Sequence, residues 1–523
     1  MIKRETIFGR NVSVYSARPS NVYEMFNQSA VKFPDREAVI QDGKRISYYQ
    51  LKNIVEKAAG NLQRLGVKKG ERVAMLLGNH IEFIITALAC AKIGAVFVPL
   101  NTKLTINELS YMIGHSGAVA IITSKKYLPE IGGWVKKSSL RLCLLIDGKE
   151  EGWLSFQEEM GRAAVSFGVA LTDQMPLYIL YTSGTTGLPK GGIGSHINVI
   201  HSAISYREVM QSDESTRTLI AIPLFHVTGL IGQLFHMLLV GGAIILLERY
   251  STVPYIQTVA KEKATFLFNV PTIYIMMMDH ESFRNHSYEH VKTIAYGGAP
   301  ISAETVKTIR THFPHASLHN AYGATETTSP TTVMPREYGM DKIASVGLPV
   351  PVAEIKTVKT DGRVCAPDEV GELYIKGPMV VPGYWENDEA NKKAFDDDGF
   401  WKSGDLARID PDGFVYIMDR KKDMINRGGE KIYSIEVENA LYRHPKVLEA
   451  SVVGMEDPLF GEYVKAYVVK KPESDVTESE LIQFAKEQLA DYKVPKEIEF
   501  LDELPRNAGG KVLKTRLMGM GSH

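Results

Sequence analysis

Apolar positions between residues 46 and 123 follow two patterns, one with a helical period and one continuous. A first helix is predicted before Gly66 by apolar residues three or four positions apart, at Leu51, Ile54, Val55, Ala58, Leu62 and Leu65. Short apolar runs at 72–77, 95–100 and 119–123 predict buried strands, and the segment 81–92 predicts a second helix. Strands that alternate with helices are typical of a mostly parallel sheet covered by helices. This pattern therefore predicts an α/β fold.

The same alternation returns between residues 218 and 296. Strands are predicted at 218–222, 243–247, 265–270 and 292–296, so a second set of parallel strands is expected. Beyond about residue 345 the pattern changes to short strands separated by Gly and Pro, as in 371–378, which is typical of antiparallel structure.

The last hundred residues change again to a compact α+β pattern. Segments 447–454 and 463–470 alternate as strands, and Thr477 with Glu480 forms a capping box that starts a helix running to about Tyr492. The predicted fold class is thus α/β, with a large N-terminal domain of parallel-rich βα sheets and a small, mobile α+β C-terminal domain. The predicted domains are residues 1–419, with a β-barrel-like antiparallel subdomain at about 345–419, a hinge at 420–423 and a small domain at 424–523.

Composition excludes several classes of protein. The chain of 523 residues is long enough for two or three domains. Lys and Arg number 60 and Asp and Glu number 61, so no overall field favours nucleic acid or an anionic membrane. The three cysteines have no metal or disulfide spacing. The longest apolar stretch, 81–100, is interrupted by Glu82, Lys92, Gly94 and Pro99, and the N-terminus has no secretory signal. We expect a cytoplasmic protein with no nucleic-acid partner and no integral membrane segment.

One short segment concentrates residues that bind phosphate. After the apolar run 177–180, residues 181–191 read Tyr-Thr-Ser-Gly-Thr-Thr-Gly-Leu-Pro-Lys-Gly. Glycines let backbone N–H groups curl around an anion, hydroxyls donate to phosphate oxygens or ligate a cation, and Lys190 adds a positive charge. Because Gly191 follows Lys190, this is not the G-x-x-x-x-G-K-[ST] loop. A surface turn is the structural alternative, but the position after a buried strand favours a polyphosphate-binding loop.

Three further clusters carry polar chemistry. Residues 320–327, Asn-Ala-Tyr-Gly-Ala-Thr-Glu-Thr, can stack on a base, contact phosphate and hold Mg²⁺, although a polar turn after a strand has the same composition. Residues 297–300, Gly-Gly-Ala-Pro, bring backbone close to a ligand or form a tight strand-to-helix turn. The carboxylate of Asp405, between a glycine and an apolar strand, can accept ribose hydroxyls, whereas Asp410 and Asp412 belong to a hairpin turn.

Two single residues are ambiguous from their surroundings alone. Lys511 lies on a glycine loop, where a lone lysine is ordinarily a solvated charge. His226 lies in an apolar run, where a core histidine is the default.

These segments occur in the order found in the adenylate-forming superfamily, and the resemblance covers essentially the whole chain. That family includes acyl-CoA synthetases, the adenylation domains of peptide synthetases and firefly luciferase. The resemblance implies that ATP, Mg²⁺ and coenzyme A bind here, CoA being a co-substrate. The sequence departs from the family at Lys431, where Asn is common, and at Ser434, where Pro is common.

The resemblance also implies roles for individual residues. Lys511 bridges the carboxylate and the α-phosphate, Glu326 and Thr185 ligate Mg²⁺, and His226 is a gate beside the acyl pocket. The residues implied to bind phosphate are Thr182, Ser183, Gly184, Thr185, Thr186, Gly187, Lys190 and Thr325. The adenine and acyl pockets are lined by Gly298, Ala299, Asn320, Ala321, Tyr322 and Gly323, with Tyr322 packing on adenine. The ribose contacts Asp405 and Arg420, Lys422 is the hinge, and Gly428 and Gly429 approach the pantetheine arm of CoA.

The function expected from this resemblance is that of an AMP-forming acyl-CoA ligase for a small-molecule carboxylic acid. The pocket segments 225–229, 297–299 and 320–323 are small or apolar and lack arginine, which favours an apolar tail or an aryl ring over a dicarboxylate such as malonate. Medium- or long-chain fatty acids are the expected substrates, and aryl acids of the benzoate or succinylbenzoate type are the alternative. Loading of a carrier protein and a non-catalytic nucleotide sensor remain as other hypotheses. A homodimer would be unsurprising, although the sequence does not fix the oligomeric state.

Overall fold

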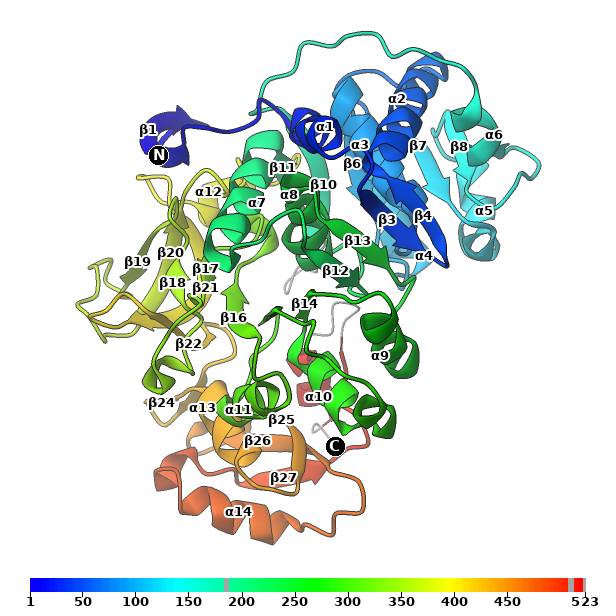
Figure 1. The fold of residues 1–523 in the computed structure, drawn as a ribbon. Helices are drawn as coiled ribbons and strands as arrows, with labels where there is room; N and C mark the ends of the chain where they lie inside the picture. The colour runs from blue at the N-terminus through cyan, green and yellow to red at the C-terminus, as the bar shows by residue number, and fades with distance from the viewer. Residues whose placement is uncertain (183–187, 507–511, 521–523) are drawn as a thin grey trace.

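The computed structural model describes residues 1–182, 188–506 and 512–520, which form a large N-terminal domain and a small C-terminal domain (Figure 1). Two sheets form the centre of the large domain. In spatial order, the strands of the seven-stranded sheet are β11 (Lys190–Ser195), β10 (Pro176–Thr182), β6 (Val96–Pro99), β5 (Arg72–Leu76), β7 (Ala118–Thr123), β8 (Leu142–Leu145) and β9 (Leu154–Ser155). Those of the nine-stranded sheet are β18 (Leu348–Pro349), β17 (Thr332–Val333), β16 (Ser317–Tyr322), β15 (Thr293–Gly297), β14 (Phe266–Asn269), β12 (Arg217–Ile220), β13 (Ala243–Leu246), β3 (Glu37–Gln41) and β4 (Lys44–Ser47).

Helices fill the space between the sheets and cover their outer faces. One continuous apolar core joins both sheets to α1 (Val22–Lys32), α2 (Tyr48–Arg64), α3 (Ile81–Ile93), α7 (His196–Met210) and α8 (His236–Val240). A second core packs α4 (Ile106–Ser116) and α5 (Leu128–Val135) on the first sheet. A third packs α9 (Thr252–Lys261), α10 (Pro271–Asp279) and α11 (Ala303–His312) on the second sheet. Apart from Glu82 and Lys92 near its ends, the helix α3 is apolar on all sides, as expected for a helix buried between layers.

The strands and helices predicted in this domain are confirmed within one or two residues, and so is the parallel-rich α/β class. Strands β3, β13, β12, β14, β15 and β16 run parallel, as do β5, β6, β7 and β8. The β10–β11 pair is antiparallel and closes one edge of the first sheet. Two hairpins were not predicted: β1 (Ile2–Ile7) with β2 (Arg10–Tyr15), and β3 with β4.

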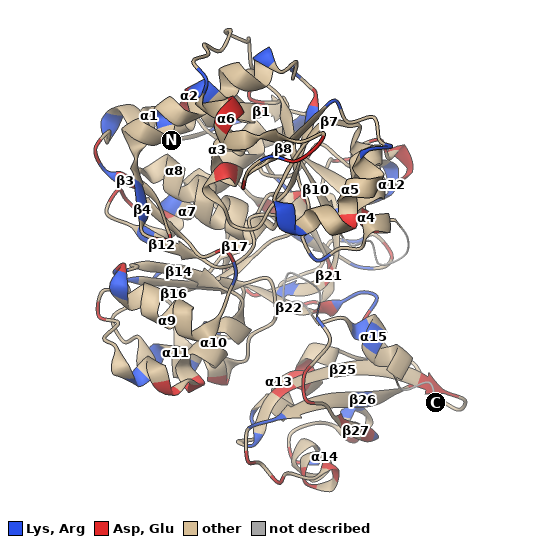
Figure 2. Cartoon of the chain, turned by 90° about the vertical axis from the view of Figure 1, so that its right-hand side faces the viewer, with Lys and Arg blue, Asp and Glu red and all other residues tan. Residues whose placement is uncertain are grey.

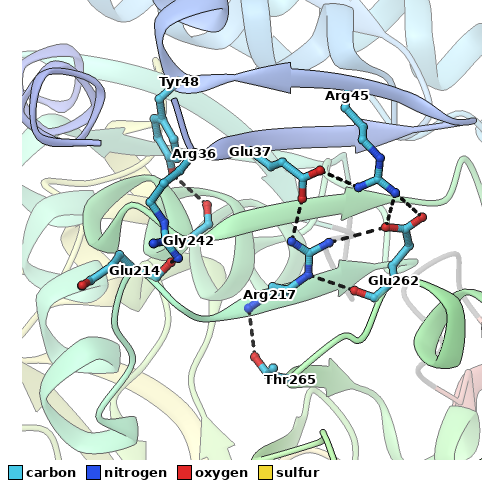
Figure 3. Close-up of polar contacts among 9 residues, drawn as sticks. All are labelled: Arg36, Glu37, Arg45, Tyr48, Glu214, Arg217, Gly242, Glu262 and Thr265. Atoms are coloured by element: carbon cyan, nitrogen blue, oxygen red, sulfur yellow. Dashed lines mark hydrogen bonds and ion pairs between the residues drawn. The ribbon is translucent and has the colours of Figure 1, made fainter. Parts of the chain in front are cut away.

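An ion-pair network fastens the β3–β4 hairpin to the neighbouring part of the nine-stranded sheet (Figure 3). Arg217 donates to Glu37 at 2.7 Å and to the backbone oxygen of Glu262 at 2.9 Å. Arg45, on β4, makes a two-pronged contact with Glu262 at 2.8 and 2.9 Å. Because the Glu262 side chain is only 8% exposed, its charge depends on both arginines.

Replacing Arg217 with methionine is therefore expected to lower the free energy of unfolding of the large domain by about 2 kcal/mol, measured by urea denaturation. Arg207→Met is the matched control, because Arg207 pairs with its exposed neighbour Glu208, and the variant should lose less than about 0.5 kcal/mol. Equal losses in the two variants would contradict a stabilising role for the network.

A four-stranded antiparallel sheet follows, where short strands were predicted. Its strands are β19 (Glu354–Val358), β20 (Gly371–Lys376), β21 (Trp401–Ile409) and β22 (Val415–Arg420), and the short helix α12 (Asp388–Ala394) lies between β20 and β21. The predicted hairpin turn at 410–413 is confirmed, since the N–H of Gly413 donates to the carbonyl of Asp410 at 2.9 Å. Lys342 pairs with both Asp410 and Asp412 there.

The small domain lies below the large one and is joined to it beside β22 (Figure 2). Its sheet contains β24 (Glu430–Ile432), β23 (Ile425–Arg427), β26 (Gly461–Lys470), β25 (Val447–Asp457) and β27 (Glu497–Phe500), and its helices are α13 (Ser434–Tyr442), α14 (Glu478–Lys486) and α15 (Lys514–Met520). The predicted cap is present, because Thr477 accepts from the N–H of Glu480. The predicted extension of α14 to Tyr492 is wrong. The helix ends at Lys486, and Leu489 and Tyr492 leave the helical path to pack on the core of this domain.

Charged residues of both signs are interspersed over the ribbon (Figure 2), in keeping with the net charge of −1. Among the helices of the described residues, none combines the length and apolar character that crossing a bilayer requires.

Candidate active site

The candidate site lies at the carboxyl ends of four neighbouring parallel strands, β12, β14, β15 and β16. Loops that leave this edge carry His226 after β12, the 297–299 segment after β15, and the 322–326 segment after β16. In open α/β sheets, ligands bind in the crevice outside the carboxyl ends of the strands. The fold therefore gathers three of the predicted clusters at one edge.

Asp405 connects this edge to the four-stranded sheet. Its Oδ2 accepts a hydrogen bond from the hydroxyl of Tyr322 at 2.5 Å, and its Oδ1 lies 3.2 Å from Nε of Arg420. Asp405 faces Arg420 in the β21–β22 ladder and is 7% exposed. Burial, and then the Asp405 carboxylate, raise the pKa of Tyr322, so that its hydroxyl stays protonated and donates. Each carboxylate oxygen retains a lone pair for a further donor, such as a ribose hydroxyl.

Glu326 lies one short turn beyond Tyr322, in the 3₁₀ segment Thr325–Thr327. Its Oε1 accepts from the hydroxyl of Tyr384 at 2.9 Å, and its backbone oxygen accepts from the N–H of Val381. Desolvation raises the pKa of this half-buried carboxyl group, which means that its charge is incompletely compensated by the protein. An oxygen ligand with unmet negative charge is what a Mg²⁺ ion prefers.

The strand that follows the predicted phosphate loop lies beside two neighbours of Glu326, namely Tyr384 and Thr325. Thr182 and Lys190 face each other in the β10–β11 pair, and Nζ of Lys190 lies 5.6 Å from the centre of the Tyr384 ring. The strand β11 approaches the 325 segment closely, since a Cβ added at Gly192 would lie 3.4 Å from the Thr325 methyl group. Five residues predicted to bind phosphate or metal lie outside the described residues, namely Ser183, Gly184, Thr185, Thr186 and Gly187.

His226 precedes a π-helical segment, Thr228–Phe235, of a kind that is frequent at functional sites. The loop before it is fixed by Asn79, which accepts from the N–H of Leu224 at 2.9 Å and donates to the carbonyl of Ile222. The Nε2 atom of His226 is buried and has no hydrogen-bond partner among the described residues. Burial lowers the pKa of His226 to about 4, so the ring is neutral at physiological pH.

The remaining residues of the predicted pocket shape it either through their backbone or through a side chain. Gly297 is directly opposite Ala321, and a Cβ at Gly297 would lie 2.2 Å from the Ala321 carbonyl oxygen, so only glycine fits. Gly298 and Ala299 follow on the surface side of this edge, and Gly323 follows Tyr322. Asn320 is buried and donates to the carbonyl of Ser345 at 3.1 Å, so its side chain holds the pocket wall.

The predicted hinge and CoA-facing residues lie at and beyond the junction of the domains. Lys422 is exposed in the turn between β22 and β23. Gly428 and Gly429 form the exposed tip of the β23–β24 hairpin, with φ of +62° and +94°, a conformation that L side chains rarely adopt. Lys511 lies outside the described residues, and the flanking Arg506 and Val512 form an antiparallel bridge.

Tyr384 is the site residue that sequence reasoning missed. It reaches Glu326 and Lys190 because residues 383–385 bridge to β11, with the N–H of Trp385 donating to the carbonyl of Gly191 at 2.7 Å. The only signal in the sequence was an aromatic pair, Tyr384 and Trp385, after Gly383, and such pairs are common in turns. Within the described part of the chain, no group of three or more His, Cys, Asp or Glu side chains could hold a metal ion.

Comparison with protein families gives two matches that together span most of the chain. The family described as AMP-binding enzyme matches residues 26–385, and the AMP-binding enzyme C-terminal domain matches residues 436–511.

Individual proteins resemble the chain over nearly its whole length. It is 36% identical over 495 residues to 2-succinylbenzoate–CoA ligase of Bacillus licheniformis, covering 94% of this chain and 98% of that protein. It is 35% identical over 481 residues to feruloyl-CoA synthase of an Amycolatopsis species, covering 92% and 95%. Among solved structures, O-succinylbenzoate coenzyme A synthetase from Bacillus subtilis, in complex with ATP and magnesium ion, superposes with a TM-score of 0.82 at 33% identity, covering 94% of this chain and 98% of that one.

Proposed function

The chain belongs to the family of AMP-binding enzymes, and from this premise we propose that it joins an aryl carboxylic acid to coenzyme A at the expense of ATP. The observation that carries the proposal is the contact of Asp405 with both Tyr322 and Arg420. It supports a nucleoside site, because the flat ring of Tyr322 after β16 meets a carboxylate and a guanidinium of the distant β21–β22 hairpin at the carboxyl edge of a parallel sheet.

The chemistry requires two half-reactions. A carboxylate is a poor electrophile because its leaving group would be oxide. In the first half-reaction, a carboxylate oxygen attacks the α-phosphorus of ATP, the bond to pyrophosphate breaks, and an acyl-adenylate forms. In the second, the CoA thiolate attacks the acyl carbon, AMP leaves with the bonding electron pair, and a thioester forms.

Each described residue has a proposed part in these steps. Asp405 and Arg420 orient the ribose, and the Tyr322 ring packs against the base. Lys190 places a cation beside Tyr384, where it attracts the phosphates. Neutral His226 lines the acyl side and excludes water.

A magnesium ion fits the donor set at Glu326. The Glu326 carboxylate is desolvated and accepts from Tyr384, and strand β11, which follows the phosphate loop, approaches the neighbouring Thr325. Thr185 is the second proposed ligand. Since Mg²⁺ is usually held by one or two protein oxygens together with phosphates and water, a single carboxylate suffices. When bound, the ion neutralises charge on the phosphates.

The acid is proposed to be aromatic. The relatives named above act, by name, on 2-succinylbenzoate and on ferulate, both of which are aryl acids. The small and apolar lining of residues 297–299 and the neutral His226 suit a flat apolar body. Medium- or long-chain fatty acids, favoured by the sequence alone, remain a prediction that the relatives do not support.

Acid-dependent exchange of labelled pyrophosphate into ATP tests the proposal. Aryl acids, fatty acids and aliphatic dicarboxylates such as malonate are offered singly, and the products with CoA or with a phosphopantetheine-bearing carrier protein are identified by mass spectrometry. We expect exchange with aryl acids, AMP as the nucleotide product, and an aryl-CoA thioester. Formation of ADP, or exchange with no acid of the panel, would overturn the proposed reaction.

Replacing Asp405 with asparagine is expected to raise the KM for ATP by roughly 10- to 100-fold, because hydrogen bonds to an ionised acceptor are lost while the shape is kept. The KM for the acid should change little. Asp412→Asn is the matched control, since Asp412 lies in the 410–413 turn and pairs with Lys342. An unchanged KM for ATP in Asp405→Asn would place the ribose elsewhere.

A further inference from the structure

Four side chains form a buried polar network across the junction of the two domains. Asp419 belongs to β22 of the large domain, and Ser434, Glu438 and Lys514 belong to the small domain. We propose that Asp419, Ser434 and Lys514 are positioning residues of the two-step reaction, because they form a latch that holds the small domain in the orientation of this structure.

Asp419 supplies the large-domain half of the latch. It is 2% exposed, its Oδ2 accepts from the N–H of Ser434 at 2.5 Å, and its Oδ1 accepts from the hydroxyl of Ser434 at 3.0 Å. Its Oδ1 also accepts from the N–H of Arg420 at 2.7 Å. Both carboxylate oxygens are therefore engaged, and one residue of α13 provides two of the three donors.

Lys514 closes the small-domain half. Its Nζ lies 2.8 Å from Oε1 of Glu438 and donates to the hydroxyl oxygen of Ser434. Glu438 is itself buried and accepts from the N–H of Val452 at 2.9 Å. Burial disfavours the ammonium form, but the carboxylates of Glu438 and Asp419 outweigh it and raise the pKa of Lys514. The lysine therefore stays charged inside the network, at the start of α15 and three positions after Lys511 in the sequence.

The position of the hinge turns this network into a latch. Asp419 precedes the turn at 421–423, whereas Ser434 and Lys514 follow it. A rotation of the small domain about Lys422 would separate Asp419 from Ser434, leaving a buried carboxylate without two of its donors. Any second orientation of the small domain must therefore be reached by opening this contact.

Ser434 is the point at which the latch can be opened with least disturbance. It is the first residue of α13, a position where proline is well tolerated because the N–H has no partner within the helix. Ser434→Pro removes both donors to Asp419 while retaining the helix, and Ser434→Ala removes only the hydroxyl.

The test uses the full-length protein and two measurements. The first is the initial rate of trypsin cleavage after the exposed residues Lys421 and Lys422, followed by mass spectrometry. The second, which rests on the proposed function, is the ratio of the rate of pyrophosphate exchange to the rate of thioester formation from supplied acyl-AMP. We expect Ser434→Pro to speed cleavage about tenfold and to change the ratio at least threefold, with smaller effects of the same sign in Ser434→Ala.

Ala303→Pro is the matched control, because Ala303 is likewise the first residue of a helix, α11, in the large domain. It should change neither measurement. Unchanged cleavage in Ser434→Pro, or equal acceleration in Ala303→Pro, would overturn the latch. Faster cleavage with an unchanged ratio would overturn the positioning role. Absence of both half-reactions in the unmodified protein would instead overturn the proposed function, and the cleavage rates would still decide whether the latch exists.

Discussion

Replacing Lys511 with alanine is expected to lower the rate of acyl-adenylate formation by about 10²- to 10³-fold while leaving thioester formation from supplied acyl-AMP nearly unchanged. In the first half-reaction, a carboxylate must approach a phosphate that is itself negatively charged. A single ammonium group between them offsets this repulsion where the charge develops. In the second half-reaction, the attacked carbon belongs to a mixed anhydride, which needs no such cation. Pyrophosphate exchange and single-turnover transfer from synthetic acyl-AMP to CoA measure the two rates separately.

A substitution at the hinge provides the complementary control. Lys422→Pro fixes φ at the exposed turn after β22, where a rotating small domain would need backbone freedom. The adenylation rate should survive in this variant and thioester formation should fall. If Lys511→Ala and Lys422→Pro each damaged both half-reactions to the same extent, exchange of active-site faces by domain rotation would be contradicted.

Local elements of the fold were predictable because their causes are local. The helix at 81–92 and the strands around it were found within one or two residues, since continuous apolar runs bounded by Gly and Pro record burial directly. The helix after Thr477 was predicted correctly at its start, where a capping side chain acts, and wrongly at its end. Leu489 and Tyr492 continue an apolar pattern, but the core of the small domain draws them out of the helix.

Pairing between distant segments was not predictable from such patterns. The strand β3 lies beside β13 although about 200 residues separate them, and nothing in residues 37–41 specifies that neighbour. The arginine network around Glu262 that secures this edge was invisible for the same reason.

In the candidate site, too, some features could be predicted from the local sequence and others could not. Glycines, hydroxyls and Lys190 at 181–191 indicated phosphate by composition, and the position of Asp405 left a ribose contact open, whereas the role of Lys511 came only from the family resemblance. The structure adds what neither source contained. Tyr384 reaches Glu326 from 58 positions away, and Ser434, noted only as a departure from the family, bonds to Asp419.

Acidification is expected to destabilise the large domain at pH values well above those at which its carboxyl groups titrate. Among the described residues, four histidines are fully buried, and burial lowers their pKa from 6.5 to about 4 for His196, His236 and His319, and to about 3 for His201. Because the folded pKa lies below the unfolded one, the unfolded chain binds protons first as the pH falls. The stabilisation that comes from keeping these histidines neutral is therefore fully present above pH 6.5. Between pH 6.5 and 4 the free energy of unfolding falls by about 1.4 kcal/mol per pH unit for each histidine.

His201 isolates this effect because neither of its ring nitrogens has a hydrogen-bond partner among the described residues, and the ring stacks on Tyr15. In His201→Met no hydrogen bond is lost and one titrating group disappears. Relative to the unmodified protein, the variant should therefore gain about 2 kcal/mol of unfolding free energy between pH 7.5 and pH 5, measured by urea denaturation at each pH. His315→Met, at an exposed position, should gain nothing. If the unfolding free energy of His201→Met instead fell with pH as much as that of the unmodified protein, His201 would have to be protonated in the folded state. Burial would then not be what limits stability in acid.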